Sequence, residues 1–239
     1  MAESRTVKQL PLGMWLRPGA SFDNYHADAN SEALAALRQG GTGNMERFAF
    51  LWGAQAVGKT HLLQAACHAA TGRGEGSAYL PLREAPRLAP EMLEGLDTLA
   101  VVALDDLDAV AGQRAWEIAV FDLYNRIRDQ GSGMLLVAAR RPLAELGLGL
   151  PDLQSRLSWG LVYQLQAMTD DEKRQALQQR ADSRGFELPD EVAGYLLRHY
   201  QRQTGALFEL LERLDQVSLA EQRRLTVPFV KQVIESVQE

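Results

Sequence analysis

Cysteine is almost absent from this 239-residue sequence, in which Cys67 is the only one. A single cysteine excludes an internal disulfide framework and is typical of a reducing cytoplasm. No apolar run approaches the roughly 18 residues that a membrane span needs, and the N-terminus has no apolar stretch long enough for a signal peptide. We therefore expect a cytoplasmic protein with no membrane partner, in which Cys67 is an inert core thiol.

Positive charge is also scarce, since 25 lysines and arginines stand against 31 aspartates and glutamates, for a formal net charge of −6. A protein that grips DNA by neutralising its phosphates usually shows a basic surface. The basic residues here are scattered, and Arg140 and Arg141 form only a small cluster. DNA contact is therefore expected to be indirect at most.

Hydrophobic residues make up 46% of the chain, which is enough for a buried core. Short continuous apolar runs, typical of strands buried on both faces, occupy residues 47–52, 77–82, 99–104, 133–139 and 161–165. Helical patterns alternate with them. The one before Gly131 gathers on a single face Trp116, Val120, Leu123, Tyr124 and Ile127. This alternation predicts an α/β domain with a mainly parallel, five-stranded sheet.

From about residue 167 the pattern is helical throughout. Thr169 and Glu172 form a capping-box pattern at the start of one helix, and Gly185 marks its end. Three further helical patterns follow, within residues 188–200, 204–218 and 226–237. We therefore expect a small all-helical domain after the sheet domain.

These patterns divide the chain into three parts. Residues 1–20 contain prolines and glycines with no sustained period and are predicted to form a flexible arm. Residues 21–166 form the α/β domain, whose first helix has Asn30 as its expected N-cap. Residues 167–239 form the helical domain, with the boundary near Gln166.

The segment GAQAVGKT, residues 53–60, satisfies G-x-x-x-x-G-K-[ST] after a predicted strand and before a predicted helix. Such a loop turns backbone amides toward phosphate oxygens, and the helix N-terminus adds partial positive charge. Lys59 is expected to reach the β- and γ-phosphates, and the Thr60 hydroxyl to bind Mg²⁺. The predicted nucleotide-binding residues here are Gly53, Ala54, Gln55, Ala56, Val57, Gly58, Lys59, Thr60 and His61.

Two aspartates follow the apolar run at 99–104. Asp105 is expected at the carboxyl edge of the sheet, where it can hold Mg²⁺ through water together with Thr60. Asp106 takes the position that polarises the attacking water, where many such ATPases carry glutamate. Because aspartate is one methylene shorter, the sequence leaves open whether the protein hydrolyses its nucleotide.

A phosphate-loop α/β domain followed by a small helical domain resembles the AAA+ ATPases. SFDNY (21–25) and LPDLQSRLSWGL (150–161) resemble segments of the bacterial replication initiator DnaA. FDLYNRI (121–127) and LTVPFVKQVI (225–234) are more similar still to the regulatory inactivators of DnaA. The resemblance runs from Gln9 to about Ile234. It implies an AAA+ P-loop domain with a helical lid, and no DNA-binding domain after the lid.

The resemblance also implies roles for individual residues. Arg156 matches the arginine finger, which stabilises charge on a transferring phosphoryl group from a neighbouring subunit. Two positions depart from a working ATPase. Arg140 replaces a small polar or acidic sensor that orients water, and Gly205 replaces the lid's sensor arginine, with Gln203 or Arg202 as alternatives. We therefore expect bound ADP, or ATP, with Mg²⁺ and slow hydrolysis.

The arm carries a second recognisable segment, QLPL, which is similar to the short motifs by which replication proteins bind the sliding clamp. Gln9 is expected to make the polar contact, and Leu10 and Leu12 to fill an apolar pocket. Gly13 departs from the bulky residue or proline often found there.

The leading hypothesis from the sequence is therefore a negative regulator of replication initiation. It would hold nucleotide, dock on the DNA polymerase sliding clamp (β subunit) and stimulate ATP hydrolysis by DnaA. A stand-alone loader or motor ATPase and a DNA-recruiting scaffold are the alternatives. The sequence leaves open whether the protein is itself an enzyme and whether it forms a homodimer.

Overall fold

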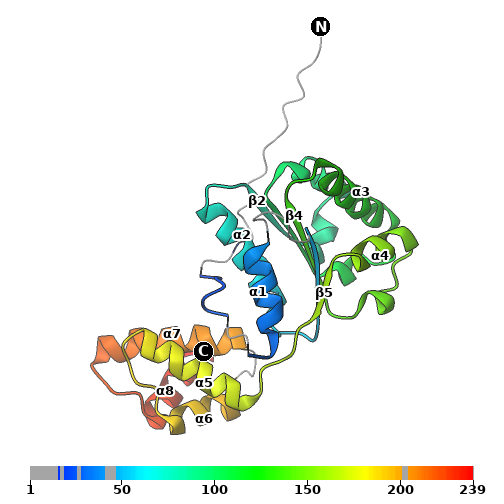
Figure 1. Cartoon of the computed structure of the whole chain (residues 1–239). Helices are drawn as coiled ribbons and strands as arrows, with labels where there is room; N and C mark the ends of the chain where they lie inside the picture. The colour runs from blue at the N-terminus through cyan, green and yellow to red at the C-terminus, as the bar shows by residue number, and fades with distance from the viewer. Residues whose placement is uncertain (1–15, 17–18, 26–27, 41–46, 201–203, 239) are drawn as a thin grey trace. The chain divides into compact units, whose positions relative to one another are not determined.

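The computed structural model describes residues 16, 19–25, 28–40, 47–200 and 204–238. The chain divides into two compact units, Met1–Gln166 and Ala167–Glu239 (Figure 1). The first contains a sheet with helices, and the second contains helices alone. Each is described by itself below.

The first unit is built on a five-stranded sheet. Its strands are β1 (Phe48–Trp52), β2 (Ser77–Pro81), β3 (Val101–Asp105), β4 (Met134–Ala139) and β5 (Leu161–Gln164). Their order is β2-β3-β4-β1-β5, and all four pairings are parallel. The predicted parallel five-stranded sheet is confirmed. Since parallel strands share their carboxyl ends, the loops after β1 and β3 open at the same edge of the sheet.

Helices cover both faces of this sheet (Figure 1). The helices α1 (Ser31–Gln39) and α2 (Lys59–Gly72) pack on one face with alternate strand residues such as Leu51 and Ala103. The helices α3 (Arg114–Gln130) and α4 (Pro151–Ser158) lie on the other, against Phe50 and Leu104. Strands covered on both faces read as continuous apolar runs, which is why the sequence located them.

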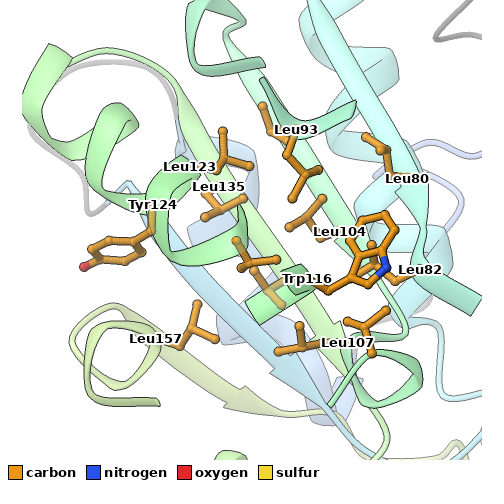
Figure 2. Close-up of a cluster of buried hydrophobic side chains, with 14 of the residues drawn as sticks. Leu80, Leu82, Leu93, Leu104, Leu107, Trp116, Leu123, Tyr124, Leu135 and Leu157 are labelled. Carbon is orange, nitrogen blue, oxygen red and sulfur yellow. The ribbon is translucent and has the colours of Figure 1, made fainter. Parts of the chain in front are cut away.

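The α3 face shows how closely local pattern determines this packing. All five side chains predicted to share that face are buried. Figure 2 shows Trp116, Leu123 and Tyr124 of this helix among leucines of the sheet and its loops. Gly131 follows the helix in the left-handed conformation, at φ 66°, as the terminator prediction requires.

The single cysteine, Cys67, is also buried, and burial raises its pKa to about 12, as expected of an inert thiol.

One local prediction holds in position only. Asn30 is the N-cap residue of α1, but its side chain makes no capping hydrogen bond. Its Nδ2 donates instead to the carbonyl of Gln166 at 3.0 Å, and its Oδ1 accepts from the Gln166 N–H at 2.8 Å. The amide thus pairs with a backbone segment at the far end of the first unit. A backbone partner that satisfies both halves of the amide outcompetes the helix terminus.

Short 3₁₀ turns fill the connections. Those between β2 and β3 are η3 (Leu82–Arg87), η4 (Pro90–Leu93) and η5 (Leu96–Thr98). Others are η2 (Asp28–Asn30), η6 (Leu107–Ala109) after β3, and η7 (Leu143–Glu145) after β4.

The second unit consists of α5 (Asp170–Ser183), α6 (Asp190–His199), α7 (Thr204–Glu221) and α8 (Val227–Gln238). The predicted capping box is present, since Glu172 N–H donates to Thr169 Oγ1 at 3.2 Å and Thr169 N–H to Glu172 Oε2 at 2.6 Å. The core is apolar and includes Leu196, Leu211 and Phe229. Among the described residues, no helix has both the length and the apolar character that a membrane span requires.

Candidate functional site

The predicted phosphate loop connects β1 to α2, at the carboxyl edge of the sheet. Gly53 and Gly58 have φ angles of 153° and 96°, in the region that favours glycine, and Ala56 is also left-handed at 65°. A Cβ at Gly53 would lie 2.6 Å from the Leu165 carbonyl oxygen, and one at Gly58 would lie 2.5 Å from the Tyr25 ring. The glycines at these two positions are therefore required by both conformation and space.

Lys59 is the first residue of α2, and its side chain lies inside the loop. Its Nζ donates to the carbonyl oxygens of Gly53 at 2.8 Å and Ala54 at 2.7 Å. Burial lowers the pKa of Lys59, an effect that the carboxylates of Asp105 and its neighbours oppose. The ammonium is thus enclosed by backbone carbonyls at the N-terminus of a helix, where an anion would find both a charge and a helix dipole.

Asp105 ends β3 and is fully buried beside α2. Its Oδ2 accepts hydrogen bonds from Thr60 Oγ1 at 2.5 Å and from the Tyr79 hydroxyl at 2.8 Å, and its Oδ1 accepts from the Asp106 N–H at 3.0 Å. Burial and then the Asp105 carboxylate raise the pKa of Tyr79 well above its usual value, so the hydroxyl keeps its proton and donates.

The pairing of Thr60 with Asp105 tests whether the site suits Mg²⁺. A hydroxyl and a carboxylate oxygen are hard ligands of the kind Mg²⁺ takes. In the described part of the chain no group of three or more histidine, cysteine or acidic side chains could hold a metal by itself. The Thr60 and Asp105 side chains supply two oxygen ligands, which fits an ion that keeps several waters and shares phosphate oxygens, as Mg²⁺ does with nucleotides.

Asp106, the predicted water-polarising residue, adopts an unusual conformation. Its backbone is left-handed, with φ 57° and ψ 48°, which non-glycine residues seldom adopt outside functional or strained sites. Its Oδ2 lies 3.6 Å from Nη1 of Arg83, just after β2. Burial and then Asp105 raise the pKa of Asp106, while Arg83 opposes them. The carboxylate is therefore paired within the chain.

Arg140 follows β4, at the same edge of the sheet. Its backbone N–H donates to Asp108 Oδ1 at 2.9 Å, and its Nε lies 3.7 Å from Asp108 Oδ2. Arg83 and Arg140 thus each face a carboxylate of the segment after β3. In the lid, Gly205 is exposed near the start of α7. The alternatives Arg202 and Gln203 lie outside the described residues.

Arg156 lies in the last turn of α4, and its surroundings differ from those of Arg83 and Arg140. Its guanidinium is stacked over the Trp159 ring, 4.3 Å from the centroid, and Trp159 itself is 62% exposed. Within the described ranges, Arg156 forms no ion pair with a carboxylate. An arginine that rests on an exposed aromatic ring keeps its charge available to a partner.

The segment SFDNY packs directly on the phosphate loop. The Tyr25 hydroxyl donates to the Val57 carbonyl at 3.2 Å, and its ring lies 5.7 Å from that of His61. Nε2 of His61, at the end of the predicted nucleotide-binding segment, lies 2.9 Å from the Ser21 carbonyl oxygen. Sequence reasoning did not find the roles of Tyr25, Tyr79 or Arg83. Only Tyr25 could have been found from the sequence, because it lies in SFDNY, one of the segments that resemble DnaA.

The predicted clamp-binding residues Gln9, Leu10 and Leu12 lie outside the described residues.

The fold is that of an AAA+ P-loop domain followed by a small helical domain. Domain III of the replication initiation protein DnaA from Thermotoga maritima matches with a TM-score of 0.72 and 19% identity, over 92% of this chain and 98% of that one. AMPPCP-bound DnaA from Aquifex aeolicus matches at 0.68 and 21%, over 84% of this chain and 66% of that one. The RuvB Holliday junction branch migration motor of T. maritima matches at 0.66 and 18%, over 91% and 72%.

A family model also matches the helical part of the chain. Residues 170–234 match the family described as Hda, lid domain. The chain therefore has a DnaA-like AAA+ fold, and its helical unit is similar to the Hda lid domain.

Proposed function

We propose that this protein is a nucleotide-bound regulator of replication initiation that acts on the initiator DnaA. The Hda lid domain, joined to a DnaA-like AAA+ fold, is the observation that carries the proposal. AAA+ domains of this kind associate through the nucleotide site of one subunit and an arginine of the next. A DnaA-like domain is therefore a suitable partner for DnaA itself.

The chain is proposed to hold ADP, or ATP, in the loop of residues 53–61. Loop amides and Lys59 bind the phosphates, and the solved relative from A. aeolicus binds the ATP analogue AMPPCP. Thr60 and Asp105 are the residues that would hold Mg²⁺, which neutralises phosphate charge when bound. ADP is the preferred resident because Gly205 has no side chain with which to contact a third phosphate.

Slow hydrolysis by the chain itself is expected from how the charged residues at this edge of the sheet are paired. Asp106 faces Arg83, and Arg140 faces Asp108, so neither is placed as a free water-orienting group. Hydrolysis needs such a group beside the γ-phosphate. We infer that the site binds nucleotide mainly to hold the domain in its active shape.

Arg156 is proposed to act in trans, as an arginine finger at the ATP site of DnaA. Its lack of a carboxylate partner in the described residues and its position on Trp159 support this role. The guanidinium would stabilise negative charge that grows on the γ-phosphoryl group during hydrolysis. The result is conversion of DnaA-bound ATP to ADP, which switches the initiator off.

Docking on the sliding clamp completes the proposal. Gln9, Leu10 and Leu12 would enter a polar and apolar pocket of the clamp as an extended segment. Docking there restricts the regulator to DNA on which synthesis has begun.

The test compares two hydrolysis rates in a reconstituted system with DNA-loaded clamp. A regulator accelerates the turnover of DnaA-bound ATP and shows slow turnover of its own. Fast turnover by the isolated chain, with no effect on DnaA, would instead identify a loader or motor. Binding to DNA in a gel shift at moderate salt, without either activity, would identify a scaffold.

A further inference from the structure

Tyr79 lies in the middle of β2, and the sheet register directs it at Asp105. Tyr79 pairs with Ala103 on β3, and Asp105 lies two residues further along that strand. Residues two apart on a strand share a face, so both side chains lie on the face that α2 covers. The Tyr79 side chain is 1% exposed, in the cluster that also contains Leu62 and Leu63. Its hydroxyl therefore has no access to solvent and donates to Oδ2 of Asp105.

Donors within the chain already occupy most of the hydrogen-bonding capacity of the Asp105 carboxylate. Oδ2 accepts from both Thr60 and Tyr79, and Oδ1 accepts from the Asp106 N–H. Thr60 is the donor that would turn to Mg²⁺ when a nucleotide is bound. Of the two side chains that donate to Asp105 in the described residues, only Tyr79 would then still do so. Tyr79 lies on β2, whereas Thr60 is in α2 and Asp105 on β3.

We propose that Tyr79 is a positioning residue that sets how strongly nucleotide binding depends on Mg²⁺. A hydrogen bond to a carboxylate disperses its charge and fixes its plane. With this donor in place, Asp105 attracts the metal and its waters less strongly, and the phosphates are held chiefly by Lys59 and the loop amides. This inference rests on the nucleotide-binding part of the proposed function, and it requires neither DnaA nor the clamp.

A structural reading of Tyr79 makes a different prediction. If the ring only fills the core and its hydroxyl only avoids an unsatisfied group, removing the hydroxyl would change stability but not the metal dependence of binding. The variant Tyr79→Phe separates the two readings, because it keeps the ring in the cluster. It leaves Asp105 with the Thr60 and Asp106 donors.

The experiment measures ADP affinity of the full chain by titration calorimetry, with Mg²⁺ in excess and with a chelator. The quantity compared is the dissociation constant measured with chelator divided by the dissociation constant measured with Mg²⁺. In Tyr79→Phe this ratio should rise by about tenfold over wild type, the order of a hydrogen bond to a charged group. The matched control is Tyr124→Phe, a buried tyrosine on the opposite face of the sheet, which should leave the ratio unchanged.

A second variant keeps the test decisive if Tyr79→Phe unfolds. Incorporation of 3-fluorotyrosine at position 79 gives a more acidic hydroxyl, which donates more strongly and should lower the ratio below that of wild type. Opposite shifts in the two variants support the proposal. An unchanged ratio in a folded variant overturns it. If wild type binds no ADP with or without Mg²⁺, the nucleotide-binding part of the proposed function fails instead.

Discussion

Buried polar side chains are distributed unevenly between the two domains. In the described residues they are Asn30, Lys59, Gln64, Asp97, Asp105, Asp106 and Glu117, all of which belong to the first unit. The described part of the lid buries none. A buried charge is costly unless neighbouring groups compensate it, so the first domain must hold its polar groups in fixed arrangements. Polar groups held in fixed positions in this way are what an ordered chemical site needs.

The charged residues of the described lid keep at least part of their surface in solvent instead. Arg184 pairs with Asp215 at 2.9 Å, and both side chains remain partly exposed. Such pairs contribute little to stability, and the core of the lid is a cluster of apolar side chains. The comparison indicates that the first domain carries the chemistry and that the lid's contribution is its packed shape. The predictions below test this division, from the largest expected effect to the smallest.

The largest effect is expected at Arg156, a half-buried charge of the first domain. Arg156→Ala should lower stimulation of DnaA-bound ATP hydrolysis by about 10³-fold, the lower end for arginine fingers. Nucleotide binding and melting temperature should not change, because no ion pair in the described residues depends on this side chain. A matched control is Arg223→Ala in the lid, where an arginine is stacked over Phe229. Undiminished stimulation by Arg156→Ala would remove the finger assignment.

Next in size is the loss expected at Lys59. Lys59→Ala should weaken ADP binding by at least about 100-fold, because it removes the buried cation of the phosphate loop. Wild type should gain stability with ADP, by about 2.7 kcal/mol at a hundredfold excess over the dissociation constant, and the variant should not. Thermal melting with and without ADP measures this, with the exposed lid residue Lys231→Ala as control. Equal ADP stabilisation in both variants would contradict the phosphate-loop assignment.

The arm allows a test outside both compact domains. Changing Gln9 and Leu10 to alanine should weaken clamp binding by about 30-fold, as expected for anchor residues of a short peptide. The melting temperature and ADP affinity should be those of wild type. Surface plasmon resonance on immobilised clamp measures the change. Full-strength binding would show that the clamp, if bound, is held by another surface.

A smaller effect is expected when a paired carboxylate is removed from each domain and the loss in stability is compared. Asp97 is buried and accepts hydrogen bonds from Arg126 at 2.9 Å and from Gln130. Asp97→Asn should cost about 2 kcal/mol in the free energy of unfolding, since it weakens charge-assisted bonds in a buried site. In the lid, Asp215→Asn should cost less than about 1 kcal/mol. Denaturant titrations compare the two, and equal costs would break the contrast between the domains.

The Asp97 contribution should also depend on pH. Burial alone would raise its pKa, but hydrogen bonds from Arg126, the backbone and Gln130 outweigh burial and lower the pKa. A folded-state pKa below the unfolded value gives stability that is present above about pH 3.9. It is lost as pH falls through the lower, folded value. The difference between wild type and Asp97→Asn should therefore shrink on acidification below about pH 4.

The smallest effect is expected at Gly205. A Cβ there meets no atom within 4 Å, so Gly205→Ala should stabilise α7 by about 0.5 kcal/mol through helix propensity. ADP affinity should not change, in keeping with a lid that contributes shape alone. Hydrogen exchange in α7 measures the first effect and calorimetry the second. A loss of ADP affinity would show that the backbone at this position takes part in binding.

Local pattern was sufficient for most of the fold. The strands, the buried face of α3 and the Thr169 capping box depend on residues close in sequence, and each was predicted. The position of Asn30 before α1 was predicted too, but the bonds of its side chain were not, because their partner Gln166 lies at the other end of the domain. A propensity for N-caps describes only the nearest backbone, and a pair of hydrogen bonds to a distant segment overrides it.

The candidate site divides in the same way. The loop with Lys59 could be read as a motif, since strand, loop and helix are continuous in sequence. The contacts of Tyr79 with Asp105 and of Arg83 with Asp106 depend on β2 and β3 lying side by side in one register. Nothing in an apolar strand pattern distinguishes a tyrosine that donates to a buried carboxylate from one that fills the core. Only the sheet topology reveals the difference.

The stacking of Arg156 on Trp159 has an optical consequence. Trp116 is buried, whereas Trp159 is the most exposed tryptophan in the described part of the chain. Its fluorescence therefore reports on water at the very surface that carries the proposed finger. A partner that covers Arg156 would dehydrate this indole and shift its emission to shorter wavelength, and Trp159→Phe would abolish that shift. The protein thus contains a label at its proposed contact, and docking can be followed in real time without attaching a dye.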